Sequence, residues 1–91
     1  MSYRLIDPDA KKDFSLDWVD WLDAGVTIDS AVWSIFPTGP TLSDQVDATP
    51  ISTIFVSGCT NGVVYELTCT ITTDAATPQI DDRSITLRCQ E

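Results

Sequence analysis

The sequence contains no histidine and few basic side chains. Its 91 residues hold five Lys and Arg against fourteen Asp and Glu, which gives a net charge of −9 at pH 7. Contacts with nucleic acid and with anionic membrane surfaces both need clustered Lys and Arg, so we expect neither as a partner. The acidity favours solubility, and it predicts a basic contact surface on any protein partner.

The lack of histidine also argues against catalysis. A Ser or Cys nucleophile would need a lysine or a carboxylate as its base, and the only lysines are the adjacent Lys11 and Lys12. Both lie in a polar opening segment, which is a poor place for a preorganised base. Gly58 and Gly62 form no phosphate cradle, because no helix is expected after them. We therefore expect no enzyme, no catalytic residue and no cofactor-binding residue.

A metal site is not expected either. The carboxylates that could form one are Asp13, Asp17, Asp20, Asp23 and Asp29. The calcium-loop pattern D-x-[DN]-x-[DN]-G is absent, and Asp13 and Asp17 would lie roughly 13 Å apart along a strand. These residues predict a solvated acidic face, and Asp81-Asp82 beside Arg83 predicts a charged strand end.

Cysteine is too scarce for a zinc site. Cys59, Cys69 and Cys89 have no CxxC spacing, and a structural zinc needs four ligands. At most one disulfide could form. Because the opening Met1-Ser2-Tyr3-Arg4 lacks the apolar core of a secretory signal, we expect a chain made in a cytoplasm with reduced, buried cysteines.

Long apolar runs and helical periodicity are missing as well. No run approaches the ~20 residues needed to cross a bilayer. No segment repeats apolar residues at 3.6-residue spacing, so no helix is expected. The 43% of hydrophobic residues, three tryptophans among them, are enough for the core of one small domain.

What the sequence does contain is period-two alternation between turns. Apolar and polar residues alternate from Phe14 to Trp18 and again near the C-terminus, and the Asn61-Gly62 dipeptide favours a tight turn. Turn signals recur about every ten residues, which is typical of a β-sandwich. We predict an all-β, immunoglobulin-like antiparallel β-sandwich of about seven strands. The strands expected from the pattern lie near 14–18, 26–36, 41–47, 51–57, 63–72 and 84–89.

The alternation also predicts a core and a boundary. Residues 1–12 are expected to be an extended, unpaired lead-in, and residues 13–91 the sandwich. The lead-in should be dispensable for folding and free to add to a neighbour's sheet edge. The residues expected to point inward are Phe14, Leu16, Trp18, Trp33, Ile35, Ile54, Val56, Tyr65, Leu67, Ile71, Ile85 and Leu87, with Cys69 and Cys89 on the same faces.

The tryptophans differ in what they predict. Trp18 and Trp33 lie on apolar strand faces and are expected in the core. Trp21 follows at a bend, where it either packs against that core or exposes an indole beside acidic groups, as a sugar- or protein-binding surface would.

Several short motifs are shared with a known family. The first half contains Asp7-Pro8-Asp9, the run from Asp13 to Trp18, Trp21-Leu22, Thr27-Ile28-Asp29-Ser30 and Val32-Trp33-Ser34-Ile35. The second contains Ser57-Gly58, Gly62, Tyr65, Ile71-Thr72-Thr73 and the run from Asp82 to Arg88. In this order the chain resembles small immunoglobulin-like virion proteins of tailed phages, the fibre–tail adaptor or tail accessory family. It departs from them at Cys59, usually glycine, and at 75–78, where a compact Gly-Arg turn is common.

The resemblance implies an architectural role and no enzymology. On that basis the chain is a non-enzymatic virion structural protein, made in the host cytoplasm and present in several copies, whose partners are other virion proteins. It mediates protein–protein assembly in the tail or neck. The alternatives are a free-standing module that binds a carbohydrate or host receptor, and a capsid decoration protein.

Overall fold

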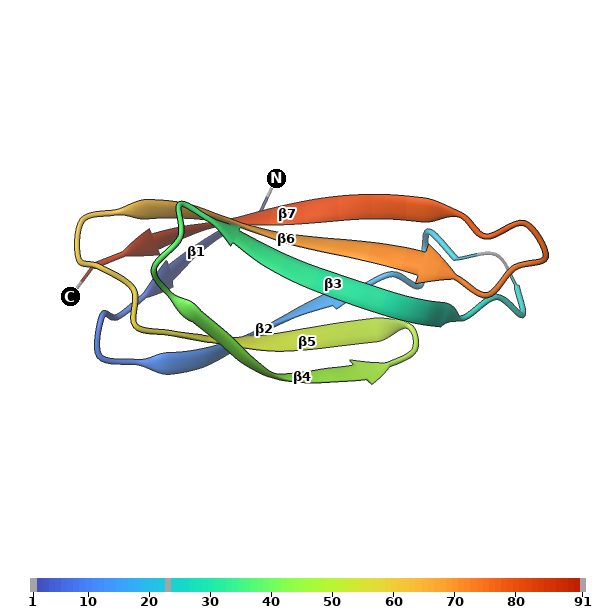
Figure 1. Cartoon of the computed structure of the whole chain (residues 1–91), viewed down its shortest axis with the longest axis horizontal. Helices are drawn as coiled ribbons and strands as arrows, with labels where there is room; N and C mark the ends of the chain where they lie inside the picture. Colours follow the sequence, from blue (N-terminus) through green and yellow to red (C-terminus); the bar gives the residue numbers. More distant parts are fainter. Residues whose placement is uncertain (1, 23, 91) are drawn as a thin grey trace.

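The computed structural model describes residues 2–22 and 24–90 as seven β-strands (Figure 1). Four of the strands end within two residues of a proline or glycine that interrupts the alternation, at Pro8, Pro37, Pro50 and Gly58. The strands are β1 (Ser2–Ile6), β2 (Lys11–Asp17), β3 (Ile28–Phe36), β4 (Thr41–Ala48), β5 (Ile51–Ser57), β6 (Val64–Thr73) and β7 (Ile80–Cys89).

The strands form two sheets packed face to face. One sheet has the order β1-β7-β6-β3 and the other β2-β5-β4, and together they measure 44 × 23 × 19 Å (Figure 1). Counted from β2, the two groups correspond to strands B, E, D and C, F, G of an immunoglobulin sandwich. The predicted fold class is confirmed, except that β1 runs parallel to β7.

Two local features reinforce the immunoglobulin-like assignment. The Tyr65 hydroxyl, at the start of β6, accepts a hydrogen bond from the backbone N–H of Thr60 at 3.0 Å, which is the arrangement of a tyrosine corner. A buried tryptophan, Trp33, lies on β3 and pairs with Cys69 on β6. The tyrosine corner therefore lies between β5 and β6, which correspond to strands E and F, and the tryptophan lies on β3, which corresponds to strand C, as this fold requires.

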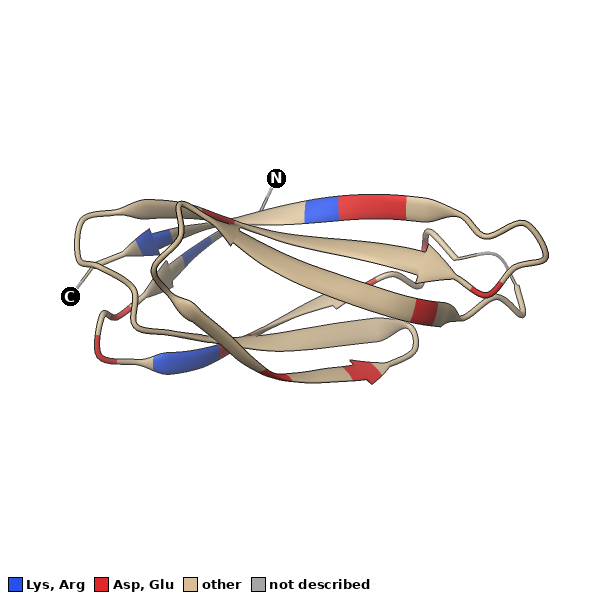
Figure 2. Ribbon diagram, in the orientation of Figure 1, with Lys and Arg blue, Asp and Glu red and all other residues tan. Residues whose placement is uncertain are grey.

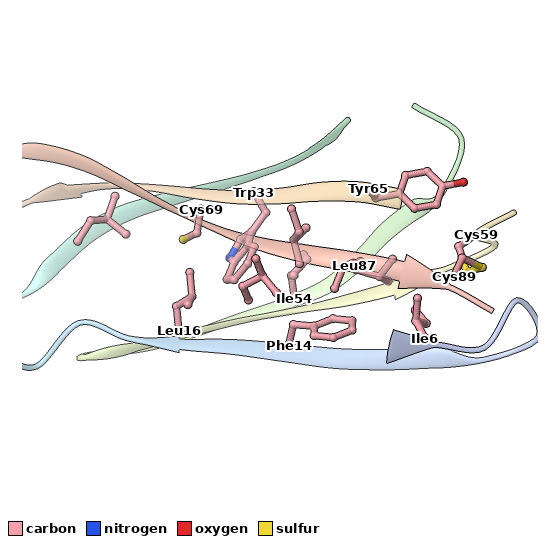
Figure 3. Packing of buried hydrophobic residues seen from close by; sticks show 14 of the residues in the cluster. Ile6, Phe14, Leu16, Trp33, Ile54, Cys59, Tyr65, Cys69, Leu87 and Cys89 are labelled. Carbon is pink, nitrogen blue, oxygen red and sulfur yellow. A yellow bond between two sulfur atoms is a disulfide. The ribbon is translucent and has the colours of Figure 1, made fainter. Parts of the chain in front are cut away.

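The core lies between the sheets and follows the predicted alternation (Figure 3). Every residue of the predicted inward set is buried except Ile35, which is half-buried and packs against the cluster. Cys69 and Cys89 are buried, as expected. The alternation missed two buried polar side chains, Ser52 and Thr73. Each has a partner within the fold: Trp33 donates to Ser52, and Gln79 N–H donates to the Thr73 hydroxyl.

The expectation of an unpaired lead-in is wrong. Residues 2–6 form β1, which pairs with β7 from Ser2–Ile85 to Ile6–Cys89, and β2 already begins at Lys11. Ile6 is only 2% exposed and belongs to the core. The apolar pair Leu5-Ile6, just before the Asp7-Pro8 turn, was the signal in the sequence: one side chain points out and the other in.

The expectation of three reduced cysteines is also wrong. Cys59 and Cys89 form a disulfide with their Cα atoms 6.1 Å apart, whereas Cys69 is a buried free thiol. Figure 3 shows the disulfide at one end of the core, beside Ile6 and Tyr65. It ties the last strand to the β5–β6 loop. The spacing of the three cysteines in the sequence does not show which two of them pair, because the pairing depends on how β7 approaches the β5–β6 loop in space.

Candidate interaction surfaces

The candidate metal residues lie on the surface and do not converge on one point. Asp13 and Asp17 are exposed on β2, Asp20 is exposed in the turn after it, and Asp29 is exposed at the start of β3. Asp23 lies outside the described residues. Within residues 2–22 and 24–90, no three metal-ligating side chains converge. The same residues include no helix that could cross a membrane.

Strand pairing brings seven carboxylates and a single base together at one end of the sandwich. Residue pairs Asp17–Ile51, Ala48–Ile51, Ile28–Thr73 and Thr72–Ile80 all lie at this end. Figure 2 shows acidic segments at both ends, whereas the basic segments of β1, β2 and the end of β7 lie towards the other end. We call this the acidic half; its charged residues are Asp17, Asp20, Asp29, Asp47, Asp74, Asp81, Asp82 and a single base, Arg83.

A hollow of about 450 Å³ opens in the acidic half. It is lined by Asp17, Asp20, Trp21, Asp81 and Arg83. Strand β2 and the turn after it supply the first three, and β7 supplies the other two. The hollow therefore combines three carboxylates, one indole and one guanidinium.

The guanidinium of Arg83 is held by neighbours other than these carboxylates. Its Cζ lies 5.4 Å from the centre of the Trp18 ring, and its Nη1 donates to the backbone carbonyl of Asp17 at 3.0 Å. Among the described residues the one ion pair joins Lys11 to Asp44, so no lysine or arginine neutralises the carboxylates of the hollow. The negative charge of the hollow therefore faces solvent without a basic partner among the described residues.

Trp21 both packs against the core and exposes part of its indole beside acidic groups, which are the two alternatives that the sequence left open. It is half-buried, packs against the core and makes an edge-to-face contact with Trp18, with ring centres 5.7 Å apart. Its remaining surface lines the hollow. Trp18 and Trp33 are buried, as predicted. The indole N–H of Trp18 is buried without a hydrogen-bond partner among the described residues.

Two exposed carboxylates are tied into the fold. Lys11 forms a hydrogen bond and an ion pair with Asp44, and these hold the pKa of Asp44 below its ordinary value. Asp74 accepts hydrogen bonds from the Thr27 hydroxyl at 2.7 Å and the Thr27 N–H at 2.8 Å, which lower the pKa of Asp74. The Asp74–Thr27 contact links the loop after β6 to the segment before β3 in the acidic half.

The other half of the sandwich has a smaller hollow, of about 360 Å³. It is lined by Arg4, Lys12, Asp13, Phe14, Ser15 and Ile85. Two bases and one carboxylate therefore line it. The two hollows differ in sign, and a partner would distinguish the two ends of the molecule by charge.

The described residues thus form a two-sheet sandwich with an acidic hollow in one half and a hollow lined by two bases in the other. The family model described as Podophage GP4 fiber-tail adaptor protein gp77 matches residues 7–88. The chain belongs to this family. No curated protein shows significant similarity to the chain.

Membership in the fiber-tail adaptor family confirms the resemblance drawn from the short motifs. The family is one of phage structural proteins, and the role of its members is tail-related. The matched segment contains the whole hollow of the acidic half and strands β2 to β6 in full, whereas Arg4 of the smaller hollow and Cys89 of the disulfide lie outside it. It begins immediately after β1, the strand that the motifs did not predict.

Proposed function

We propose that the chain is a non-enzymatic adaptor of the virion, which joins other virion proteins through the acidic half of its sandwich. The observation that carries this proposal is the hollow of Asp17, Asp20 and Asp81, whose carboxylates have no basic partner among the described residues. A protein surface rich in lysine and arginine would complement it. Opposite charges across an interface increase the association rate and fix the orientation of the partners.

The form of the site supports binding rather than catalysis. The carboxylates lie on an open surface between a turn and a strand, and Trp21 offers an aromatic contact beside them. Tryptophan and tyrosine are common anchors of protein interfaces, and an indole can also receive a partner cation over its ring. The adaptor would be present in several copies and would reach the virion from the host cytoplasm, where it is made.

The test is charge reversal with a matched control. The variant Asp17→Lys with Asp20→Lys removes two carboxylates from the hollow, and Asp9→Lys with Asp13→Lys makes the same charge change outside the acidic half. We expect the first pair to fold but to be lost from purified tails, and the second pair to be incorporated. Equal incorporation of both pairs would contradict the proposal.

Salt dependence gives a second readout for the same contact. The association rate of the wild-type chain with its tail partner should fall as salt rises, because the Debye length shortens from about 10 Å at 0.1 M to 3 Å at 1 M. The Asp17→Lys and Asp20→Lys pair should lose most of this dependence. A rate that salt leaves unchanged would place the contact elsewhere.

A carbohydrate-binding module is the second candidate, because Trp21 presents part of its indole beside carboxylates in the same hollow. The variant Trp21→Phe keeps an aromatic ring against Trp18, whereas Trp21→Ala removes it. Loss of glycan binding on an array with Trp21→Ala, together with normal assembly into tails, would favour this candidate. A cryo-EM map of the particle distinguishes tail, neck and capsid positions directly.

A further inference from the structure

Strand β3 lies at an open edge of the four-stranded sheet. It pairs with β6 on one side, and no described strand pairs with it on the other. The side chain of Gln45 donates to the Ala31 carbonyl at 2.8 Å from that open side. Since residues two apart in a strand direct their backbone groups to the same side, the N–H and C=O groups of Trp33 and Ile35 also face the open edge.

The register shift of β3 and its one charged residue, Asp29, both lie at the start of the strand, and from Ser30 to Phe36 the edge lacks the protection found on the other edge strands. Natural sheets block their edges with charged side chains, bulges or short strands. Strand β2 carries Lys11, Lys12 and two aspartates, β4 breaks its register between Ser43 and Val46, and β1 has five residues. In contrast, residues 30–43 contain no charged side chain, in a chain with a net charge of −9.

The outer face of β3 is apolar at two points. Val32 is 64% exposed and Phe36 is 75% exposed, and Ser34 lies between them on the same face. Two large apolar side chains on the uncharged part of an edge strand favour pairing with another strand.

We infer that two copies of the chain pair through their β3 edges, antiparallel and centred on Ser34. In this register Trp33 lies opposite Ile35 of the second copy, so their edge-facing backbone groups exchange hydrogen bonds. Val32 lies opposite Phe36 of the second copy, and symmetry repeats this apolar pair on the other side of the axis.

Neighbouring registers fit less well. Centring the pair on Trp33 would set Val32 against a serine, and centring it on Ile35 would set Phe36 against a serine. The second shift also brings Pro37, which has no N–H, opposite Trp33. The register centred on Ser34 is therefore the one that matches both the backbone groups and the apolar side chains.

The charge distribution fits the same arrangement. Asp29 at the start of β3 and Asp47 at the end of β4 place the acidic half beside the beginning of the strand. Antiparallel pairing moves the two acidic halves to opposite ends of the dimer. This keeps the two acidic halves apart and sets each beside a half of the other copy in which five carboxylates are nearly balanced by four bases, Arg4, Lys11, Lys12 and Arg88.

The first test measures the mass of the free protein by light scattering over a dilution series from micromolar to millimolar. We expect the wild-type chain to approach twice its 10.0 kDa mass at the high end. The variant Phe36→Lys should remain at the monomer mass, because symmetry places two new charges in the apolar contact. The control Val64→Lys changes an equally apolar, 53% exposed residue on the inner strand β6 and should still dimerise. A wild-type chain that stays monomeric at millimolar concentration would overturn the inference.

The second test reports the register. Ser34→Cys should form a disulfide between two copies under mild oxidation, because facing residues in a non-hydrogen-bonded pair have Cα atoms about 4.5 Å apart. Ser30→Cys lies on the same face of the same strand, yet the two copies of residue 30 would lie roughly 26 Å apart. Crosslinking of both variants at the same rate, or of neither, would overturn the proposed pairing. Because both tests use the free protein, their failure would leave the adaptor role untouched.

Discussion

The indole N–H of Trp33 donates a hydrogen bond to the hydroxyl of Ser52 at 2.8 Å, across the interface between the two sheets. Trp33 lies on β3 and Ser52 on β5, and both are buried. The Ser52 hydroxyl in turn donates to the carboxylate of Asp47, at the surface end of β4. A series of two hydrogen bonds therefore runs from the centre of the core to the acidic half. It gives the buried polar groups of Trp33 and Ser52 their hydrogen-bond partners.

Removing Trp33 should be the most damaging change in this chain of contacts. Trp33→Ala deletes a buried aromatic side chain, which costs about 3–5 kcal/mol, out of a total stability of about 5–15 kcal/mol for a domain. Ser52→Ala leaves the Trp33 N–H without an acceptor and should cost about 1–3 kcal/mol. Urea unfolding curves measure both. Val32→Ala, on the exposed face of the same strand, is the control, and an equal loss in all three variants would contradict the assignment of Trp33 to the core.

The Cys59–Cys89 disulfide should stabilise the domain without being needed for its core. The bond closes a loop with a sequence separation of 30, for which loop-closure entropy predicts about 3–4 kcal/mol. Cys59→Ala with Cys89→Ala should therefore lower the urea midpoint, and added reductant should lower the wild-type midpoint by the same amount. If reductant lowers the wild-type midpoint and leaves that of the double variant unchanged, the effect belongs to this bond. A wild-type midpoint that reductant does not move would show that the bond is absent in solution.

Strand β1 should be required for full stability. Ile6 is 2% exposed at the end of β1, so Ile6→Ala should cost about 2–5 kcal/mol. Leu5→Ala changes the neighbouring side chain, which is 50% exposed, and should cost less than about 0.5 kcal/mol. Deleting residues 2–6 should lower the melting temperature further. A deletion variant that melts like the wild type would restore the view that residues 1–12 are a dispensable lead-in.

The Asp74–Thr27 contact should make stability depend on pH at the acidic end of the range. Hydrogen bonds from the Thr27 hydroxyl and N–H lower the pKa of Asp74 below the ordinary aspartate value of 3.8, so the folded state favours the carboxylate. This contribution is fully present above the ordinary aspartate pKa and is lost as the pH falls through the lowered value. Asp74→Asn should be less stable than the wild type at pH 7, and the gap should close below pH 3.8. Thermal melts across this range, with Asp9→Asn as the control, measure the gap; a gap that is constant with pH would contradict the prediction.

The thiol of Cys69 should be unreactive in the folded protein. Burial raises the pKa of this thiol to about 11, and the reactive species of a cysteine is the thiolate. We expect no alkylation of the native chain by iodoacetamide at neutral pH, and modification of one thiol per chain after unfolding without reductant. Rapid labelling of the native chain would show that β6 opens or that Cys69 is accessible.

The sequence determined where six of the seven strands lie and, wherever apolar and polar residues alternate, which side of the strand faces the core. From Tyr65 to Ile71 and from Ile85 to Cys89 every second residue is apolar, and such a pattern buries one face whatever the rest of the chain does. The turns at Pro37-Thr38-Gly39-Pro40 and Asn61-Gly62 are equally local, because proline and glycine restrict or extend the backbone by themselves. The prediction that the fold does not depend on calcium also rests on a local feature, the missing calcium-loop pattern. A calcium titration of the melting temperature tests it.

Only the tertiary structure decided which distant segments meet. Ile6 became core because β1 pairs with β7 from the other end of the chain, and Cys59 found Cys89 because the same strand passes the β5–β6 loop. The hollow beside Trp21 combines Asp17 and Asp20 with Asp81 and Arg83, more than sixty positions away. Alternation is a property of neighbours along one strand, whereas an edge, a disulfide or a charged hollow depends on strand order and register. Those are set by the packing of the whole sandwich.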